Sequence, residues 1–121
     1  MLDFHLVTRS SVHGYPTRQA ARQAARAAGL RWGQYAVLIA NDTDEEADEE
    51  AIAQAKRTIA ARAHLEAALE LVESASIRAW ARSPWNRPLF VRLAALGLQK
   101  NGPASNVHMF AAFITSSAIG L

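Results

Sequence analysis

The feature that most restricts the possible folds is a long stretch, from Thr43 to Arg82, that contains neither proline nor glycine. A single helix of about 38 residues would be ~57 Å long. A compact domain of 121 residues has a diameter of only about 35 Å. We therefore expect that the helix breaks, near Ser74-Ala75-Ser76, or that it projects and packs against a second copy of the chain.

The start of this helix has its own signal. The residues Thr43-Asp44-Glu45-Glu46 match a capping box, in which the threonine caps the helix and the glutamate three residues later bonds back to it. The apolar residues that follow have helical spacing but slip in register between Ala63 and Leu65, which favours a globular bundle over a strict coiled coil. They are Ile52, Ala55, Ile59, Ala63, Leu65, Leu69, Val72 and Trp80.

The first forty residues predict strand, helix and strand. Apolar and polar residues alternate from Leu2 to Thr8, as in a half-buried strand, and turn formers between Arg9 and Pro16 predict a loop. Thr17 is a suitable cap for a helix that ends before Gly29. Residues 34–40 are too short to separate a buried strand from a buried helix, although Asn41-Asp42 after them favours a strand.

The last forty residues predict two helices. Ser83-Pro84 ends the central segment, and residues 85–88 form a short connection. Residues 89–96 are expected to be helical, with Gly97 near their end. We expect Ser105 to cap a final helix, whose many large apolar side chains predict burial within the domain or in a dimer. These side chains are Val107, Met109, Phe110, Phe113, Ile114, Ile119 and Leu121.

The predicted fold class is α+β, predominantly helical, with two short N-terminal strands and three or four helices in a single domain, 1–121. Two strands make a poor sheet unless another strand completes it. A homodimer would complete the sheet and cover the overlong helix together. Both grounds for a dimer fail if residues 34–40 are helical and the central helix breaks.

Composition excludes several classes of protein. The chain has no cysteine, which rules out disulfides and thiolate chemistry. No apolar run is longer than Tyr35 to Ala40, which is far shorter than the roughly 20 residues of a membrane helix. The start Met-Leu-Asp-Phe-His does not resemble a secretory signal, so we expect a cytoplasmic protein. The 26 alanines and 11 arginines are typical of a GC-rich coding sequence and favour a bacterial or bacteriophage origin.

Charge is distributed unevenly along the chain. Residues 1–40 contain five arginines and one acid (+4), residues 41–75 contain three bases and ten acids (−7), and residues 76–121 contain five bases and no acid (+5). This pattern permits self-association by charge complementarity, or an acidic and a basic face on one monomer.

The leading functional hypothesis is a small non-enzymatic regulator or inhibitor that binds another protein. The acidic run 42–50 is interpreted as a solvated helix start or a docking patch for a basic partner, and it lacks the glycine that a calcium loop needs. Tryptophan and arginine dominate binding hot spots. The predicted partner-binding residues are Asp44, Glu45, Glu46, Asp48, Glu49, Trp85 and Arg87.

A second hypothesis is DNA binding. Arg18, Arg22 and Arg26 recur every fourth residue and share one helix face, which is a solvated face or a contact for phosphates. With Arg31 they belong to residues 17–40, which loosely match a degenerate helix-turn-helix.

A third hypothesis is a small enzyme with an unrecognised pocket, for which His5, His13 and Tyr35 are the candidate residues. The four histidines are scattered and show no metal-binding spacing. Nucleophile-elbow, phosphate-loop and dinucleotide motifs are absent from the sequence. We therefore predict no catalytic residues, no metal and no cofactor.

Overall fold

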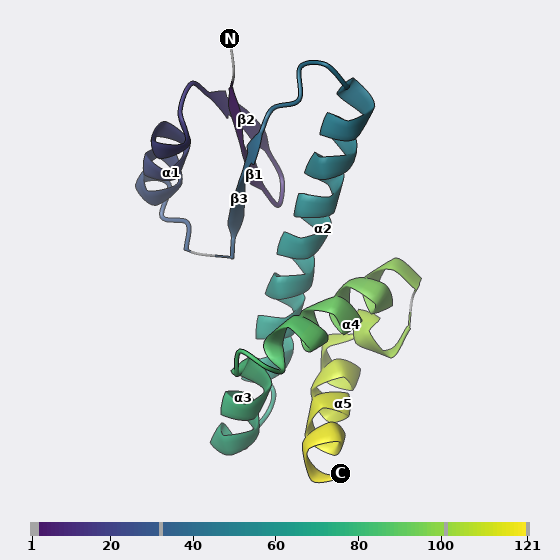
Figure 1. Ribbon diagram of the computed structural model, residues 1–121. Helices are drawn as coiled ribbons and strands as arrows, with labels where there is room; N and C mark the ends of the chain where they lie inside the picture. The colour runs from purple at the N-terminus through teal and green to yellow at the C-terminus, as the bar shows by residue number, and fades with distance from the viewer. Residues whose placement is uncertain (1–2, 32, 101, 121) are drawn as a thin grey trace. The chain divides into compact units, whose positions relative to one another are not determined.

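The computed structural model describes residues 3–31, 33–100 and 102–120 and confirms a predominantly helical α+β fold (Figure 1). The elements, in chain order, are β1 (Phe4–Thr8), β2 (Val12–Tyr15), α1 (Arg18–Ala27), β3 (Tyr35–Ile39), α2 (Glu45–Glu70), α3 (Ala75–Arg82), α4 (Arg87–Lys100), the short 3-10 helix η1 (Pro103–Ser105) and α5 (Val107–Ile119). The chain divides into two compact units, residues 1–60 and 61–121. Because α2 continues from one unit into the other, this division does not test the single-domain prediction.

The sheet of the first unit has the strand order β2-β1-β3, and both pairings are antiparallel. The two predicted strands are confirmed as β1 and β3. The predicted loop between Arg9 and Pro16 is wrong, because Val12 to Tyr15 pairs with β1 as a third strand. The hairpin turn is short: the backbone N–H of Thr8 donates to the carbonyl of Ser11 at 2.9 Å.

Helix α1 has the predicted boundaries. The hydroxyl of Thr17 accepts a hydrogen bond from the backbone N–H of Ala20 at 3.0 Å, and so caps the helix. Gly29 follows with a positive φ of 77°, a conformation that glycine adopts without strain. The N–H of Leu30 donates to the carbonyl of Ala25, which completes a Schellman-type end.

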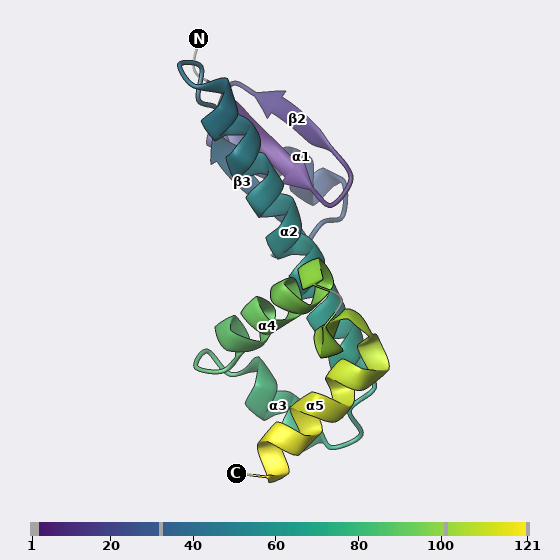
Figure 2. The ribbon, with the colours of Figure 1, turned by 90° about the vertical axis from the view of Figure 1, so that its right-hand side faces the viewer.

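Side chains that alternate along β1 face two different helices. Leu6 packs against Ala21 and Ala25 of α1, which are both fully buried. The neighbouring residue His5 points to the other face of the sheet and bonds to Asp48 of α2. The first part of α2 and α1 therefore cover opposite faces of the sheet (Figures 1 and 2).

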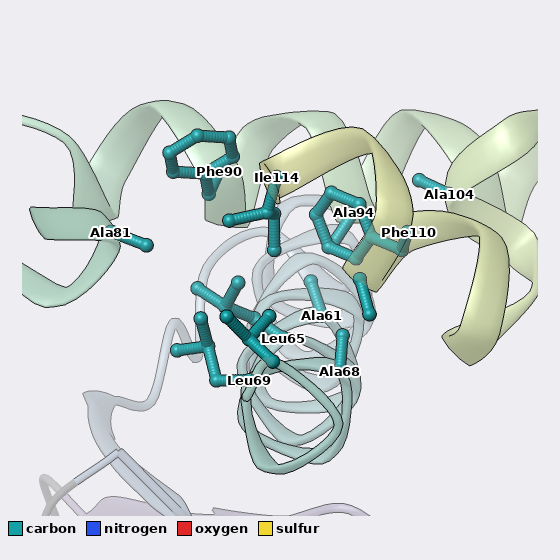
Figure 3. Close-up of a cluster of buried hydrophobic side chains, with 12 residues drawn as sticks. Ala61, Leu65, Ala68, Leu69, Ala81, Phe90, Ala94, Ala104, Phe110 and Ile114 are labelled. Carbon is teal, nitrogen blue, oxygen red and sulfur yellow. The ribbon is translucent and has the colours of Figure 1, made fainter. Parts of the chain in front are cut away.

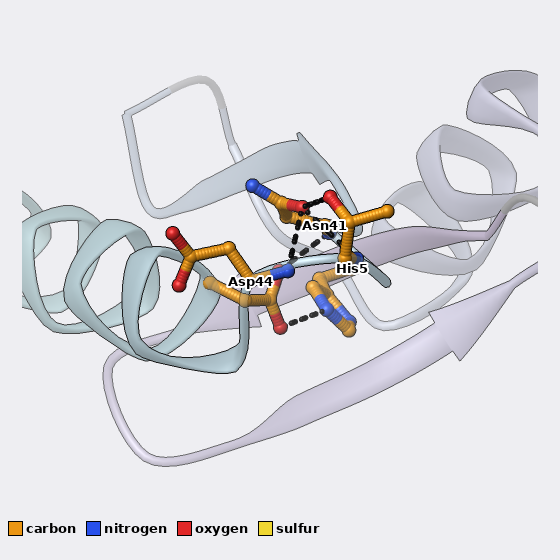
Figure 4. Close-up of polar contacts among 5 residues, drawn as sticks. His5, Asn41 and Asp44 are labelled. Carbon is orange, nitrogen blue, oxygen red and sulfur yellow. Dashed lines mark hydrogen bonds and ion pairs between the residues drawn. The ribbon is translucent and has the colours of Figure 1, made fainter.

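The capping box predicted at Thr43 is wrong by one residue. Helix α2 begins at Glu45, and the carboxylate of Asp44 accepts the N–H of Ala47 at 3.0 Å, as an N-cap does. The side-chain oxygen of Asn41 accepts the N–H groups of Thr43 and Asp44 (Figure 4). Asn41 thus folds the preceding turn and shifts the start of the helix.

The predicted break in the long helical segment is confirmed. Helix α2 ends at Glu70, and the hydroxyl of Ser74 accepts the N–H of Ile77 to cap α3. The helix breaks and a third strand completes the sheet, so neither of the two structural grounds for a dimer holds. The homodimer itself stays a prediction.

The core of the second unit gathers side chains from the end of α2, from α3, α4, η1 and α5 (Figure 3). Phe110 is fully buried at its centre. Its ring lies 5.7 Å from the ring of His64 and 6.4 Å from that of Phe90, between ring centroids. Trp80, the last of the apolar residues with helical spacing, is partly buried and packs edge-on against Phe90 of this core.

Two predicted boundaries near the C-terminus are wrong. Helix α4 does not end near Gly97 but continues to Lys100. Gly97 is needed because η1 crosses it closely: a Cβ there would lie 2.8 Å from the Cα of Ala104. Asn106, not Ser105, caps α5, because its side-chain oxygen accepts the N–H groups of His108 and Met109.

Helix α5 is apolar on two sides. Phe110 and Ile114 are buried within the unit, as predicted, and Ala111 is buried beside them. Met109 and Phe113 are 56% and 44% exposed on its outer side. The helices in the part of the chain described here are all too short or too polar to cross a bilayer.

Candidate interaction surfaces

Trp85 is the most exposed large apolar residue among those described, with 90% of its surface accessible. It lies in the turn between α3 and α4, beside Pro84. The side-chain amide of Asn86 donates to the carbonyl of Trp80 at 3.0 Å and lies 3.1 Å from the hydroxyl of Ser83. The turn is therefore tied to the end of α3, while the indole stays in solvent.

The helix that follows the turn also exposes apolar side chains. Leu89 and Leu96 are 50% and 45% exposed and, seven residues apart, lie on the same face of α4. Arg92 is exposed on the same face, three residues after Leu89. We call Trp85, Leu89, Arg92 and Leu96 the Trp85 surface.

Two arginines beside the turn form ion pairs within the second unit. Glu66 of α2 accepts from Arg82 at 2.9 Å and from Arg87 at 3.3 Å. Arg87, one of the predicted partner-binding residues, therefore bonds within its own unit. Trp85, by contrast, presents its side chain to solvent.

Two of the five acidic residues predicted to bind a partner have structural roles. Asp44 caps α2, and Asp48 bonds to His5 and to the backbone N–H of Asn41. The remaining predicted members, Glu45, Glu46 and Glu49, are exposed on the first turns of α2. Acids at this end of a helix also stabilise it against the helix dipole.

The environment of Asp48 favours its charged form. The hydrogen bond from the backbone N–H of Asn41 is the largest cause of a lowered pKa, and the hydrogen bond and charge of His5 lower the pKa further. Partial desolvation opposes both effects. Asp48, whose pKa is lowered, is therefore a structural residue that bonds α2 to β1.

The basic face of α1 is formed by Arg18, Gln19, Arg22, Gln23 and Arg26, whose side chains border an open hollow of about 370 Å³. Arg18 is held over the ring of Phe4, with its guanidinium carbon 5.4 Å from the ring centroid. The other two arginines are exposed. The structure thus brings three of the four predicted nucleic-acid-binding residues onto one face.

The fourth, Arg31, lies in the loop after α1 and is exposed there. The helix-turn-helix interpretation of residues 17–40 is wrong, because Tyr35 to Ile39 is strand β3 and not a recognition helix. The arginines of α1 therefore cannot act through that motif.

The three candidate enzyme residues do not converge. His5 faces α2. His13 pairs with Leu6 across the hairpin and lies on the opposite face of the sheet, as does Tyr35, which packs near Leu6. In residues 3–31, 33–100 and 102–120, no group of three or more histidine or acidic side chains is placed to hold a metal ion.

The role of Asn86 beside Trp85 was not predicted from the sequence. The sequence run Ser83-Pro84-Trp85-Asn86 indicates a turn here, because serine, proline and asparagine are typical turn residues.

No protein-family model, curated protein or solved structure matches this chain. Its function is therefore inferred from its own surfaces.

Proposed function

We propose that this chain is a small non-enzymatic regulator or inhibitor that binds a partner protein through the Trp85 surface. The observation that carries this proposal is the 90% exposure of Trp85 on a turn fixed by Asn86. A large apolar ring left in water has an unfavourable hydration free energy, and burying it in a partner recovers that free energy. Because the turn is already ordered, it loses little conformational entropy when a partner binds.

Charge indicates the chemistry of the partner. Residues 76–121 contain five bases and no acid, and Arg92 lies within the Trp85 surface. A partner with an apolar pocket for the indole and carboxylates around that pocket complements this surface. The expected bacterial or bacteriophage origin, cytoplasmic location and dimeric state belong to the same hypothesis and stay predictions.

The test begins with a photo-crosslinking amino acid placed at Trp85 in the cells from which the chain comes. A chain with the same amino acid at Leu98, which is 39% exposed on the opposite side of α4 from Leu89, serves as the control. We expect one partner to crosslink at position 85 and not at position 98. An adduct consisting only of two copies of this chain would contradict a separate partner.

The affinity of the captured partner is then measured with purified proteins. Trp85→Ala is expected to weaken binding at least about 30-fold, because a hot-spot residue contributes about 2 kcal/mol or more. Leu98→Ala is the matched control, since Leu98 is 39% exposed but lies on the opposite side of α4 from Leu89. Equal affinities for the Trp85→Ala variant and the unchanged chain would refute the proposal.

A further inference from the structure

The basic face of α1 carries charge that no acidic side chain in the described part of the chain neutralises. Helix α1 contains no acidic residue. Among the described residues, Arg22 and Arg26 form no ion pair, and Arg18 has only its contact with the ring of Phe4. The acidic start of α2 covers the opposite face of the sheet (Figure 2). The three guanidinium groups are therefore available to an external anion.

The spacing of these arginines suits a linear array of charges. Residues four apart rise by about 6 Å along a helix, so Arg18 and Arg26 lie about 12 Å apart along the axis. One strand of a duplex presents about three to four phosphates over that length. Gln19 and Gln23 lie among the arginines on the same face and add amide donors.

The same face lacks the residues that a protein interface uses. The only apolar residues of α1 are alanines, and the two that are fully buried, Ala21 and Ala25, face the sheet. Protein interfaces depend on a buried apolar or aromatic centre. A polyanion needs no such centre, because its affinity comes from phosphate contacts and counterion release.

We infer that the outer face of α1 binds the phosphate backbone of nucleic acid without reading base sequence. This interaction is separate from the proposed contact through Trp85, which belongs to the other unit. A chain that uses both the outer face of α1 and the Trp85 surface would bring its protein partner to nucleic acid. Without the partner, the chain alone would stay bound to nucleic acid.

The test measures fluorescence anisotropy of labelled duplex DNA, single-stranded DNA and RNA with the full chain between 50 and 200 mM salt. Three phosphate contacts predict a slope of log affinity against log salt of about −2.7 for duplex DNA, equivalent to about a 40-fold loss over this range. The slope for single strands is expected to be about −2. Failure to bind any of the three at 50 mM salt would overturn the inference.

Variants assign the interaction to α1. Replacing Arg18, Arg22 and Arg26 by glutamine is expected to abolish most of the salt dependence and weaken binding at least about 10-fold at 50 mM salt. The control variant combines Lys56→Gln, Arg57→Gln and Arg62→Gln, all in α2, which removes the same net charge away from both proposed surfaces. Circular dichroism checks that both variants fold. An equal loss of affinity in the two variants would mean that net charge, and not α1, is responsible.

Two further measurements separate the alternatives. Poly-glutamate is added as a competitor at the same charge concentration as the nucleic acid. Displacement as effective as that by unlabelled DNA would favour an acidic protein partner and overturn the inference. Trp85→Ala is expected to leave the affinity for nucleic acid unchanged, so failure of the Trp85 proposal and failure of this one remain distinguishable.

Discussion

The imidazole Nε2 of His5 lies 2.9 Å from carboxylate Oδ2 of Asp48, a residue 43 positions later in the chain. The other oxygen of the same carboxylate accepts the backbone N–H of Asn41, also at 2.9 Å. One side chain of α2 therefore binds the central strand and the segment that leaves β3 (Figure 4). This carboxylate joins the first turns of α2 to the sheet.

Replacing Asp48 by asparagine is expected to change how stability depends on pH. The pKa of Asp48 is lower in the folded chain than the ordinary value of 3.8. Its charged form therefore contributes stability above about pH 4, and this contribution is lost as the pH falls through the lowered folded pKa. Thermal unfolding followed by circular dichroism from pH 7 to pH 2 should show a smaller acid-induced decrease in Tm for Asp48→Asn, from a lower starting value.

Asp42→Asn is the control for this measurement. Asp42 is an exposed carboxylate in the same loop, and its variant should follow the unchanged chain across the pH range. Parallel profiles for Asp48→Asn and the unchanged chain would show that the bond to Asp48 does not contribute to acid sensitivity.

Gly97→Ala is expected to destabilise the second unit. The new Cβ would lie 2.8 Å from the Cα of Ala104 and 2.9 Å from its carbonyl carbon. Overpacking of this kind costs about 1–3 kcal/mol, more than the roughly 1 kcal/mol that alanine gains over glycine inside a helix. Denaturant unfolding should therefore give a lower free energy of unfolding.

A second glycine provides the comparison. A Cβ at Gly14, in strand β2, would meet nothing within 4 Å, so Gly14→Ala should leave the free energy of unfolding nearly unchanged. Adding Ala104→Gly to Gly97→Ala should restore only part of the stability, because the backbone of residue 104 stays close. Full stability of the single variant would show that η1 does not pack tightly on α4.

The outcome for particular elements shows what local sequence determines. Thr17 and Gly29 bound α1 as predicted, since a cap and a positive φ depend on the residue itself. The break before α3 follows from Ser74 in the same way. Strand β2 was missed because its identity comes from pairing with β1, which Gly14 and the surrounding turn formers conceal.

The same distinction, between features set by local sequence and features set by contacts between distant residues, applies to the candidate surfaces. Helical spacing alone placed Arg18, Arg22 and Arg26 on one face. The exposure of Trp85 depends on how α3 and α4 meet, and the sequence left it open. The internal bond of Arg87 to Glu66 joins residues 21 positions apart, a contact that no local pattern predicts.

Replacing His64 by phenylalanine is expected to maintain or increase stability. Its Nε2 is buried and has no hydrogen-bond partner among the described residues, while its ring stacks on Phe110. An unsatisfied buried polar atom costs about 1–3 kcal/mol, and phenylalanine keeps the stacked ring without that atom. Denaturant unfolding should show no loss, and His108→Phe, at an exposed position, should change little. A loss above about 1 kcal/mol for His64→Phe would show that Nε2 has a partner.

Asn86→Asp is expected to loosen the turn that presents Trp85. The side-chain amide of Asn86 donates to the carbonyl of Trp80, and a carboxylate has no proton to donate in its charged form. The loss of this bond should cost about 1 kcal/mol and lower the heteronuclear NOE of the Trp85 backbone and indole N–H groups.

The same substitution at Asn106 is the matched control, because Asn106 only accepts hydrogen bonds, from the N–H groups of His108 and Met109. Aspartate accepts them equally well at a helix N-cap. Stability and the Trp85 relaxation values should therefore stay unchanged in Asn106→Asp. If Asn86→Asp also leaves the Trp85 values unchanged, the turn is held by Pro84 and the backbone, and Asn86 does not position the indole. If the values fall and partner affinity falls with them, the fixed geometry of the turn contributes to binding.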